Sequence, residues 1–307
     1  MKKDLRIIFM GTPDFAIPSL RILIDNGYHI VAVITAQDKP RGRGRKLTPP
    51  PVKSFALEHN IPVLQPPNLK DSVFIDELKS FKANLQVVVA FRMLPEVVWS
   101  MPEYGTFNLH ASLLPDYRGA APINWVLING ETKTGLTTFF IKHEIDTGNI
   151  IFLEEVDISY HDDAGSLHDK LMIRGADLVL KTVRAIEVDS YMVKIQEDAP
   201  ELKKAPKIFR EMCEIDWNQD STQVYNFVRG LSPFPGAWMV LNSKMYKIFR
   251  VQVLSEDDQV NAPGVFETDS KSFLNIQCSK GIVSITELQP EGKRKMKIED
   301  FFRGNQL

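Results

Sequence analysis

Three polar side chains alternate with apolar residues in segment 105–112, and their types suit catalysis. Asn108, His110 and Ser112 occupy every second position, and apolar or small residues fill the positions between them. Residues two apart on a β-strand project from the same face, so this spacing brings an amide, an imidazole and a hydroxyl together. An amide can donate to a developing oxyanion, and an imidazole can exchange a proton near neutral pH.

The place where this strand ends also favours a site. Residues 113–115 stop the strand and 118–122 lead into a helix, and open α/β sheets bind ligands at the carboxyl ends of their strands. Polar residues at a strand end can equally satisfy loop backbone groups, so that structural alternative stays open. A carboxylate to orient His110 is still required. Asp146 is by default a turn residue, but it supplies this carboxylate if its loop lies over the sheet end.

The elements that must position these residues alternate between strands and helices. Apolar runs at 5–10, 29–34, 85–91 and 135–141 predict buried strands, and helical spacing follows the first of them. This β-α-β pattern predicts an α/β domain with a parallel sheet over 1–189. The glycine fingerprint of dinucleotide-binding sites is absent, which makes an NAD site a weak interpretation.

The pattern changes beyond a polar, proline-containing stretch. Residues 190–207 are predicted to form a linker, and several short strands separated by turn signals follow it. Such a series predicts a small β-barrel over 208–307. The predicted strands are 237–241, 244–254, 264–267, 273–277 and 281–288.

Composition limits the class of protein. The 307 residues are 44% hydrophobic and 25% charged, which is typical of a soluble globular protein, and the net charge of -2 predicts no overall basic surface. Cys213 and Cys278 show no metal-site spacing and suit a reducing compartment. Neither a signal peptide nor a membrane-spanning stretch is evident. We expect a cytoplasmic protein without membrane contact and without a metal.

Two local basic clusters stand out against this balance. Segment 38–53 interrupts the α/β pattern with cations spaced by proline and glycine, and it predicts a mobile segment without a core. A solvated linker is one interpretation, but we favour nucleic-acid contact because a connection this long is uncommon unless it is functional. The second cluster lies at 293–297, where phosphate contact and a solvated hairpin are equally plausible interpretations.

The central motif, read with a second one, resembles a known family. The run Asn108-Leu-His-Ala-Ser-Leu-Leu-Pro115, joined with Asp146-Thr-Gly148, resembles the signature of the 10-formyltetrahydrofolate-dependent formyltransferases. Segment 11–16 and the basic run 41–46 are similar to those members of the family that act on methionyl-tRNA. Three C-terminal segments, 215–217, 229–237 and 288–293, resemble the second domain of the same members, so the resemblance covers essentially the whole chain.

This resemblance implies both a fold and a site. It implies a Rossmann-like, mostly parallel sheet in the formyltransferase domain, followed by a small OB-like β-barrel. The implied catalytic residues are Asn108, His110 and Asp146. The implied contacts with 10-formyltetrahydrofolate, made largely by backbone groups, involve Phe91, Arg92, Met93, Leu94, Ser112, Leu113, Leu114 and Pro115. The implied contacts with tRNA involve Arg41, Arg43, Arg45, Lys46 and Lys293.

We therefore expect a monomer that transfers a formyl group from 10-formyltetrahydrofolate to the amino group of methionyl-initiator tRNA, for translation initiation. Asn108 is expected to hold the oxyanion, His110 to move the proton, and Asp146 to orient His110. One alternative is a family member that acts on a small amine, such as an amino sugar nucleotide, but such a substrate needs neither the basic loop nor the barrel. A second alternative is a non-catalytic tRNA-binding protein, which has no evident use for all three polar residues.

Overall fold

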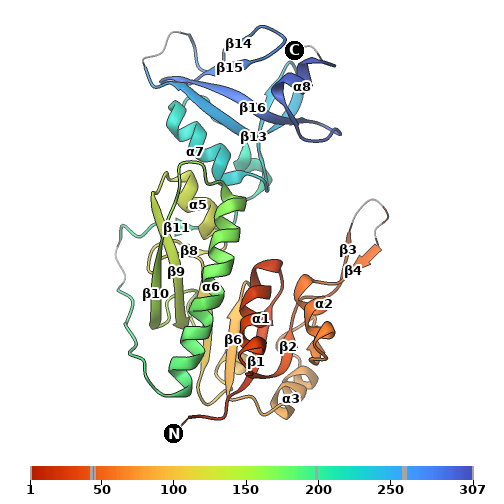
Figure 1. Cartoon of the computed structure of the whole chain (residues 1–307), viewed down its shortest axis with the longest axis vertical. Coiled ribbons are helices and arrows are strands. Elements are labelled where there is room, and N and C mark those ends of the chain that lie inside the picture. The colour runs from red at the N-terminus through yellow and green to blue at the C-terminus, as the bar shows by residue number, and fades with distance from the viewer. Residues whose placement is uncertain (1, 42–43, 45, 198–199, 258–260, 306–307) are drawn as a thin grey trace. The chain divides into compact units, whose positions relative to one another are not determined.

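The computed structural model describes residues 2–41, 44, 46–197, 200–257 and 261–305 (Figure 1). They form two compact units. The first contains Met1–Gly119, Thr134–Val156 and His168–Lys203, and the second contains Ala120–Lys133, Asp157–Leu167 and Lys204–Leu307. Each unit is thus assembled from separate segments, whereas the sequence analysis divided the chain into consecutive ranges. No helix in the described ranges is both long enough and apolar enough to cross a membrane.

A seven-stranded sheet forms the centre of the first unit, in the order β10-β9-β7-β6-β1-β2-β5. Its strands are β1 (Arg6–Gly11), β2 (His29–Ile34), β5 (Val63–Leu64), β6 (Leu85–Val89), β7 (Thr106–His110), β9 (Lys133–Phe140) and β10 (Ile150–Asp157). The five strands from β7 to β5 are parallel, and β9 is antiparallel to β7. Strands β1 and β6 are almost entirely buried, as expected for a sheet covered on both faces. This sheet confirms the predicted Rossmann-like fold class.

Strand order reverses between β1 and β6, because β2 follows β1 on one side and β6 lies on its other side. The carboxyl ends of these two strands therefore form the topological switch point, where open α/β sheets bind ligands. The loop that follows β6 begins at Ala90, which adopts a left-handed φ of 49°.

Helices cover this sheet where apolar residues recur at helical spacing. They are α1 (Ile17–Asp25), α2 (Pro51–Glu58), α3 (Ser72–Ser80), α4 (Glu96–Trp99) and α6 (Ala164–Glu187). Asp71 caps α3 by accepting hydrogen bonds from the N–H groups of Val73 and Phe74. Helix α6 packs on the face of the sheet that carries Leu109. Gly175 of this helix comes so close to that residue that an added Cβ would lie 2.8 Å from the Leu109 Cδ2. Side chains at alternate positions of β7 consequently point to the other face.

The basic segment is more regular than the sequence predicts. β3 (Lys39–Arg41) and β4 (Lys46–Thr48) form an antiparallel pair, and α2 already begins at Pro51. At the base of this hairpin, Lys53 Nζ lies 2.9 Å from Asp38 Oδ1, and Gln65 Nε2 donates to the same carboxylate at 2.8 Å. These bonds lower the pKa of Asp38. The sequence analysis predicted a mobile segment without a core over 38–53, and it did not foresee this strand pair or the start of α2 at Pro51.

An antiparallel sheet forms the centre of the second unit, in the order β12-β13-β16-β15-β14, with β17 beside β16. Its strands are β12 (Ala237–Leu241), β13 (Lys244–Ser255), β14 (Phe266–Thr268), β15 (Leu274–Gln277), β16 (Ile282–Pro290) and β17 (Met296–Lys297). Register shifts along the pairing of β13 with β16 mark irregularities of the kind that bends a sheet. The curled sheet confirms the predicted small C-terminal barrel.

The helices of the second unit are α5 (Pro122–Ile128), α7 (Ser221–Leu231) and α8 (Ile298–Phe302). Asp220 and Gln223 form a capping box that starts α7, and the buried residues of that helix join the barrel core. Cys278 lies in this core, where burial raises the pKa of its thiol to about 12. The thiol is therefore protonated and unreactive at neutral pH. The sequence analysis predicted the main strands of this unit but missed β17 and α8.

Candidate active site

The structure brings His110 and Asp146 together. His110 is the last residue of β7, and its Nδ1 lies 3.8 Å from Asp146 Oδ2. The two side chains are only 7% and 15% exposed, so water screens this contact weakly. The distance is too long for a hydrogen bond, but it is short enough for the carboxylate to stabilise a charged imidazole.

A backbone carbonyl determines which nitrogen of His110 carries hydrogen. His110 Nε2 lies 2.9 Å from the carbonyl oxygen of Tyr117, and a carbonyl oxygen can only accept. The Nε2–H group must therefore donate. In the neutral imidazole, Nδ1 is left as the nitrogen that can accept a proton. Tyr117 presents this carbonyl from a left-handed turn, with a φ of 60°.

Asp146, like Tyr117, has a left-handed backbone conformation. Its φ is 55°, and its Oδ2 accepts a hydrogen bond of 2.9 Å from the N–H group of Gly119. Because β9 is antiparallel to β7, Phe140 near the end of β9 lies opposite Phe107 near the start of β7. The loop that follows β9 therefore departs from the far end of the strand that carries His110. Asp146 nevertheless reaches the imidazole.

Asn108 offers a free amide beside this pair. It lies two positions before His110 on β7, on the same face and opposite to the face covered by α6, and it is half-buried. Its backbone is paired on both sides, with Val88 on β6 and Phe139 on β9. Within the described part of the chain, its side-chain amide makes no hydrogen bond. An amide N–H in this position is available to a ligand oxygen.

Ser112 supports the turn after β7. Its Oγ donates to the carbonyl oxygen of Asp116 at 2.7 Å, and the residue is fully buried. Thr137 on β9 ties the same turn, because its Oγ1 donates to the Ser112 carbonyl at 2.6 Å and accepts from the Leu114 N–H at 3.1 Å. Ser112 therefore acts on the shape of the loop. Leu113 and Pro115 remain half-buried, whereas Leu114 packs into a small apolar cluster.

The loop after β6 lies at the switch point. Arg92 donates to the carbonyl oxygens of Pro66 and Pro67, and its guanidinium carbon lies 5.7 Å from the centre of the Phe91 ring. Met93 is 70% exposed, whereas Leu94 is buried in the core. Arg92 is thus engaged with the neighbouring loop, and the exposed part of 91–94 is mainly Arg92 and Met93.

The positions expected to contact tRNA are only partly described. Arg43 and Arg45 lie outside the described residues, and for Arg41 only the backbone, in β3, is described. Lys46 is exposed on β4. In the second unit, Lys293 Nζ lies 2.9 Å from Asn305 Oδ1. Lys295 Nζ lies 2.7 Å from Glu287 Oε2, so this lysine is paired with an acid.

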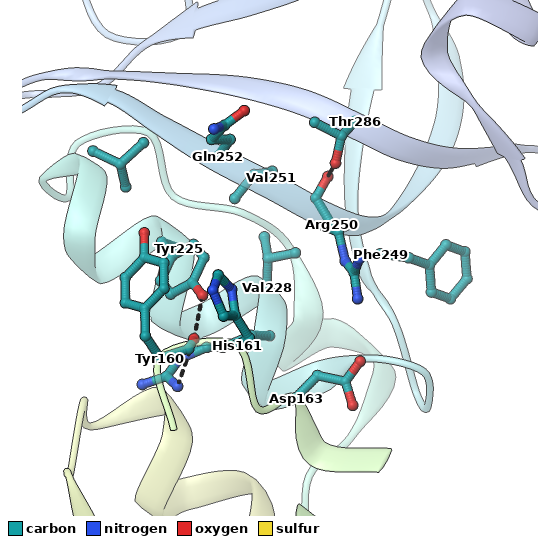
Figure 2. Close-up of a pocket in the computed structure, with 12 residues that line it drawn as sticks. Tyr160, His161, Asp163, Tyr225, Val228, Phe249, Arg250, Val251, Gln252 and Thr286 are labelled. Carbon is teal, nitrogen blue, oxygen red and sulfur yellow. Dashed lines mark hydrogen bonds between the residues drawn. The ribbon is translucent and has the colours of Figure 1, made fainter. Parts of the chain in front are cut away.

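A cavity of about 370 Å³ lies in the second unit between α7 and β13 (Figure 2). Tyr160 and Tyr225 stack at its rim, with ring centroids 4.8 Å apart and an interplanar angle of 11°. Arg229 reaches the carbonyl oxygens of Ser159 and Asp162, both at 3.3 Å. Burial lowers the pKa of Arg229 and raises that of Tyr225. These contacts tie the segment before α6 to α7.

We expect Arg229→Met to lower the stability of the second unit by about 1–3 kcal/mol, because it removes hydrogen bonds from a charged donor to half-buried carbonyls. Denaturant unfolding of the whole chain measures this loss. Arg250→Met is the matched control, since Arg250 lines the same cavity but is exposed. Equal stability of the two variants would show that the carbonyl contacts of Arg229 contribute nothing.

Two family models match the chain. The model described as formyl transferase matches residues 5–183, and the model described as formyl transferase, C-terminal domain, matches residues 207–306. The chain belongs to the formyl transferase family. Among curated relatives of this formyl transferase, the methionyl-tRNA formyltransferase of Bacteroides thetaiotaomicron is 53% identical, covering 100% of this chain and 97% of the relative. The methionyl-tRNA formyltransferase of Flavobacterium johnsoniae is 49% identical, covering 98% and 96%.

Solved structures share the fold of this formyl transferase at lower identity. WlaRD, a sugar 3N-formyl transferase solved in the presence of dTDP and 5-N-formyl-THF, is 22% identical with a TM-score of 0.69, covering 95% of this chain and 100% of that chain. HypX from Aquifex aeolicus, solved with tetrahydrofolic acid, is 19% identical with a TM-score of 0.66, covering 98% of this chain and 48% of that chain. Among the described residues of this formyl transferase, no group of three or more His, Cys, Asp or Glu side chains is arranged to hold a metal ion.

Gly148 brings the Asp146 loop against β9. A Cβ at this position would lie 1.6 Å from the carbonyl oxygen of Phe140. We expect Gly148→Ala to displace the loop, to cost about 1–3 kcal/mol of stability and to lower kcat at least tenfold, because Asp146 lies two residues away. Thermal unfolding and steady-state kinetics measure both effects. Gly304→Ala is the control, since nothing lies within 4 Å of its added Cβ. Normal activity of Gly148→Ala would contradict the expectation.

Proposed function

We propose that this formyl transferase moves the formyl group of 10-formyltetrahydrofolate to the amino group of methionine carried by initiator tRNA, for translation initiation. The observation that carries the proposal is the site itself: the buried His110–Asp146 pair with the free amide of Asn108 beside it. Two curated relatives about 50% identical over the whole chain are named methionyl-tRNA formyltransferase, which supports this choice of acceptor.

The residue types match what the reaction requires. Attack of the amine on the formyl carbon places negative charge on the formyl oxygen and positive charge on the amine nitrogen. The Asn108 amide donates to that oxygen. Nδ1 of His110 accepts the proton of the amine, while Nε2–H stays bonded to Tyr117. Asp146 stabilises the resulting imidazolium, which returns the proton to the departing N10 of the folate.

The loops at the switch point fit a folate. Residues 91–94 and 112–115 follow the neighbouring strands β6 and β7, so their backbone groups reach the same edge of the sheet. The Ser112 hydroxyl and the Arg92 guanidinium are already bonded, to the carbonyl oxygen of Asp116 and to those of Pro66 and Pro67. Backbone N–H and C=O groups and the apolar surface of Met93 are what remains to hold the donor.

The tRNA is proposed to bind through the two basic clusters, at Arg41, Arg43, Arg45 and Lys46 in the first unit and at Lys293 in the second. Cations spaced by glycine along one segment of the sequence suit phosphate contact, which positions a nucleic acid without reading its sequence. We also propose that 1–189 carry the chemistry and that 208–307, joined through 190–207, serve the tRNA. The enzyme is proposed to act as a monomer in the cytoplasm.

We expect Lys46→Ala to raise KM for methionyl-tRNA several-fold and to reduce the dependence of binding on salt by about one phosphate contact. KM for the folate should not change, because Lys46 lies on the exposed hairpin. Steady-state kinetics at several salt concentrations measure both values. Lys79→Ala, at another exposed lysine, is the control. An unchanged salt dependence in Lys46→Ala would remove this lysine from the tRNA interface.

The decisive experiment offers the purified enzyme 10-formyltetrahydrofolate with charged initiator tRNA, charged elongator methionine tRNA or an amino sugar nucleotide. Formylation of the initiator tRNA alone is the expected result. Formylation of the amino sugar alone would overturn the proposal and leave the chemistry in place. That acceptor is the second candidate because WlaRD is described as a sugar formyl transferase, although at 22% identity the likeness extends only to the fold.

A further inference from the structure

The side chain of Gln196 joins two segments of the site. Its Nε2 donates to the carbonyl oxygens of Asp146 at 2.8 Å and Gly148 at 2.7 Å. Its Oε1 accepts from Arg118, at 2.8 Å from Nη2 and 3.1 Å from Nε. A glutamine amide has two N–H donors and one oxygen with two lone pairs. Gln196 uses all of this capacity within the first unit.

The turn that Gln196 holds has few other contacts: Thr147 Oγ1 donates to the Glu144 carbonyl at 3.1 Å, Lys142 Nζ donates to Asn149 Oδ1 at 2.7 Å, and the Gly119 N–H binds the Asp146 carboxylate. Residues 142–145, which precede Asp146, are all exposed, so packing does not define the course of the loop. Asp146 itself adopts a left-handed φ of 55°, a conformation that residues other than glycine adopt infrequently, although Asp tolerates it better than most. Such a turn persists only where its surroundings enforce it. The two hydrogen bonds from Gln196 bind its backbone on both sides of Thr147.

On its other side, Gln196 holds the segment that anchors His110. Arg118 lies between Tyr117, whose carbonyl accepts from His110, and Gly119, whose N–H donates to the Asp146 carboxylate. Through the guanidinium of Arg118, Gln196 therefore links the segment that orients the imidazole with the backbone that carries the carboxylate. We propose that Gln196 is a positioning residue for formyl transfer, which sets the separation of His110 Nδ1 and Asp146 Oδ2. This proposal rests on the proposed function.

A simpler role for Gln196 is to attach the chain after α6 to the sheet. The chain is attached to β10 without Gln196, because Lys194 and Ile150 exchange two backbone hydrogen bonds, both of 2.8 Å. The segment is thus attached two residues before Gln196. Loss of the Gln196 amide should loosen the turn at Asp146 and leave the fold in place.

Gln196→Met tests the proposal, since it keeps the length of the side chain and removes all of its hydrogen bonds. We expect kcat to fall about tenfold or more, with KM for both substrates within about twofold, because a small displacement of a catalytic pair has a large effect on rate. When Gln196→Met is combined with Asp146→Asn, it should lower kcat by less than about twofold relative to Asp146→Asn alone. The interaction of His110 with the carboxylate, which Gln196 positions, is already lost in that variant. A purely structural role predicts that Gln196→Met lowers kcat by the same factor in the wild-type enzyme and in Asp146→Asn. That result would overturn the proposal.

Nitrogen NMR of the His110 ring gives a second readout that needs no substrate. Gln196→Met should shift the ring signals of His110, whereas Gln223→Met should leave them and kcat unchanged. Gln223 is the matched control because it also bonds a backbone group, the N–H of Asp220, but in the capping box of the second unit. Unchanged His110 signals in Gln196→Met would overturn the proposal even if the rate fell.

Gln196→Glu replaces Gln196→Met if the methionine variant does not fold. It keeps an acceptor for Arg118 but loses both donors to the Asp146 turn, so the same loss of kcat and the same non-additivity with Asp146→Asn are expected. If the wild-type enzyme formylates no methionyl-tRNA, the proposed function fails. The NMR comparison would still decide whether Gln196 positions the pair.

Discussion

Replacing His110 with alanine is expected to lower kcat for formyl transfer by about 10²–10⁴-fold, the usual contribution of a positioned general acid–base group. The imidazole can both accept the proton of the attacking amine and return it to the leaving nitrogen. Its Nε2–H is committed to the Tyr117 carbonyl, so the exchange must use Nδ1. Neighbouring water is a poor substitute because the side chain is only 7% exposed.

Steady-state kinetics with charged initiator tRNA measure this loss, and thermal unfolding with folate binding verifies that the variant is folded. His168→Ala is the matched control. His168 also belongs to the first unit and lies 3.0 Å from a carboxylate, that of Asp169, but it is on α6. Its variant should retain nearly full activity. A His110→Ala enzyme within tenfold of wild type would remove this residue from the proton transfer.

Replacing Asn108 with alanine is expected to lower kcat by about 10²–10³-fold, the usual loss when one oxyanion donor is removed. The stability should hardly change, because the amide makes no hydrogen bond within the described residues and is only half-buried. A large loss of rate at constant stability distinguishes a catalytic donor from a packing residue.

The comparison variant at this position is Asn108→Asp, which keeps the shape of the side chain and removes its N–H donors. It should be at least as inactive as Asn108→Ala, because a carboxylate also repels the developing charge on the formyl oxygen. Unfolding temperatures of the two variants verify that neither has lost the fold. Near-normal rates in both would mean that the formyl oxygen is held elsewhere.

The sequence predicts the parts of this site that depend on local spacing. Asn108 and His110 share a face because they are two apart on a strand, and the sheet forms as its apolar runs predict. The direction of β9 could not be predicted in this way. An antiparallel strand next to a parallel set depends on long-range pairing, and it decides that the Asp146 loop approaches from the far end of β7.

The residues missed by the sequence analysis act through backbone groups or at a distance. The Tyr117 carbonyl and the Gly119 N–H reach the pair from a turn that any short polar segment could form. Gln196 lies in a stretch whose composition predicts only a linker, and its bonds appear once three separate segments have folded together. The short elements α4, β17 and α8 were missed because a few residues carry too little periodicity.

The bond between Arg118 and Gln196 spans 78 positions of the chain, and this separation has a consequence for the newly made enzyme. A ribosome adds about 5–20 residues per second, so the parts of the site are synthesised roughly 4–16 s apart. Until Gln196 has emerged, a nascent chain can hold His110 and Asp146 without the link between them. An enzyme that serves the start of translation would thus reach its full rate only late in its own synthesis.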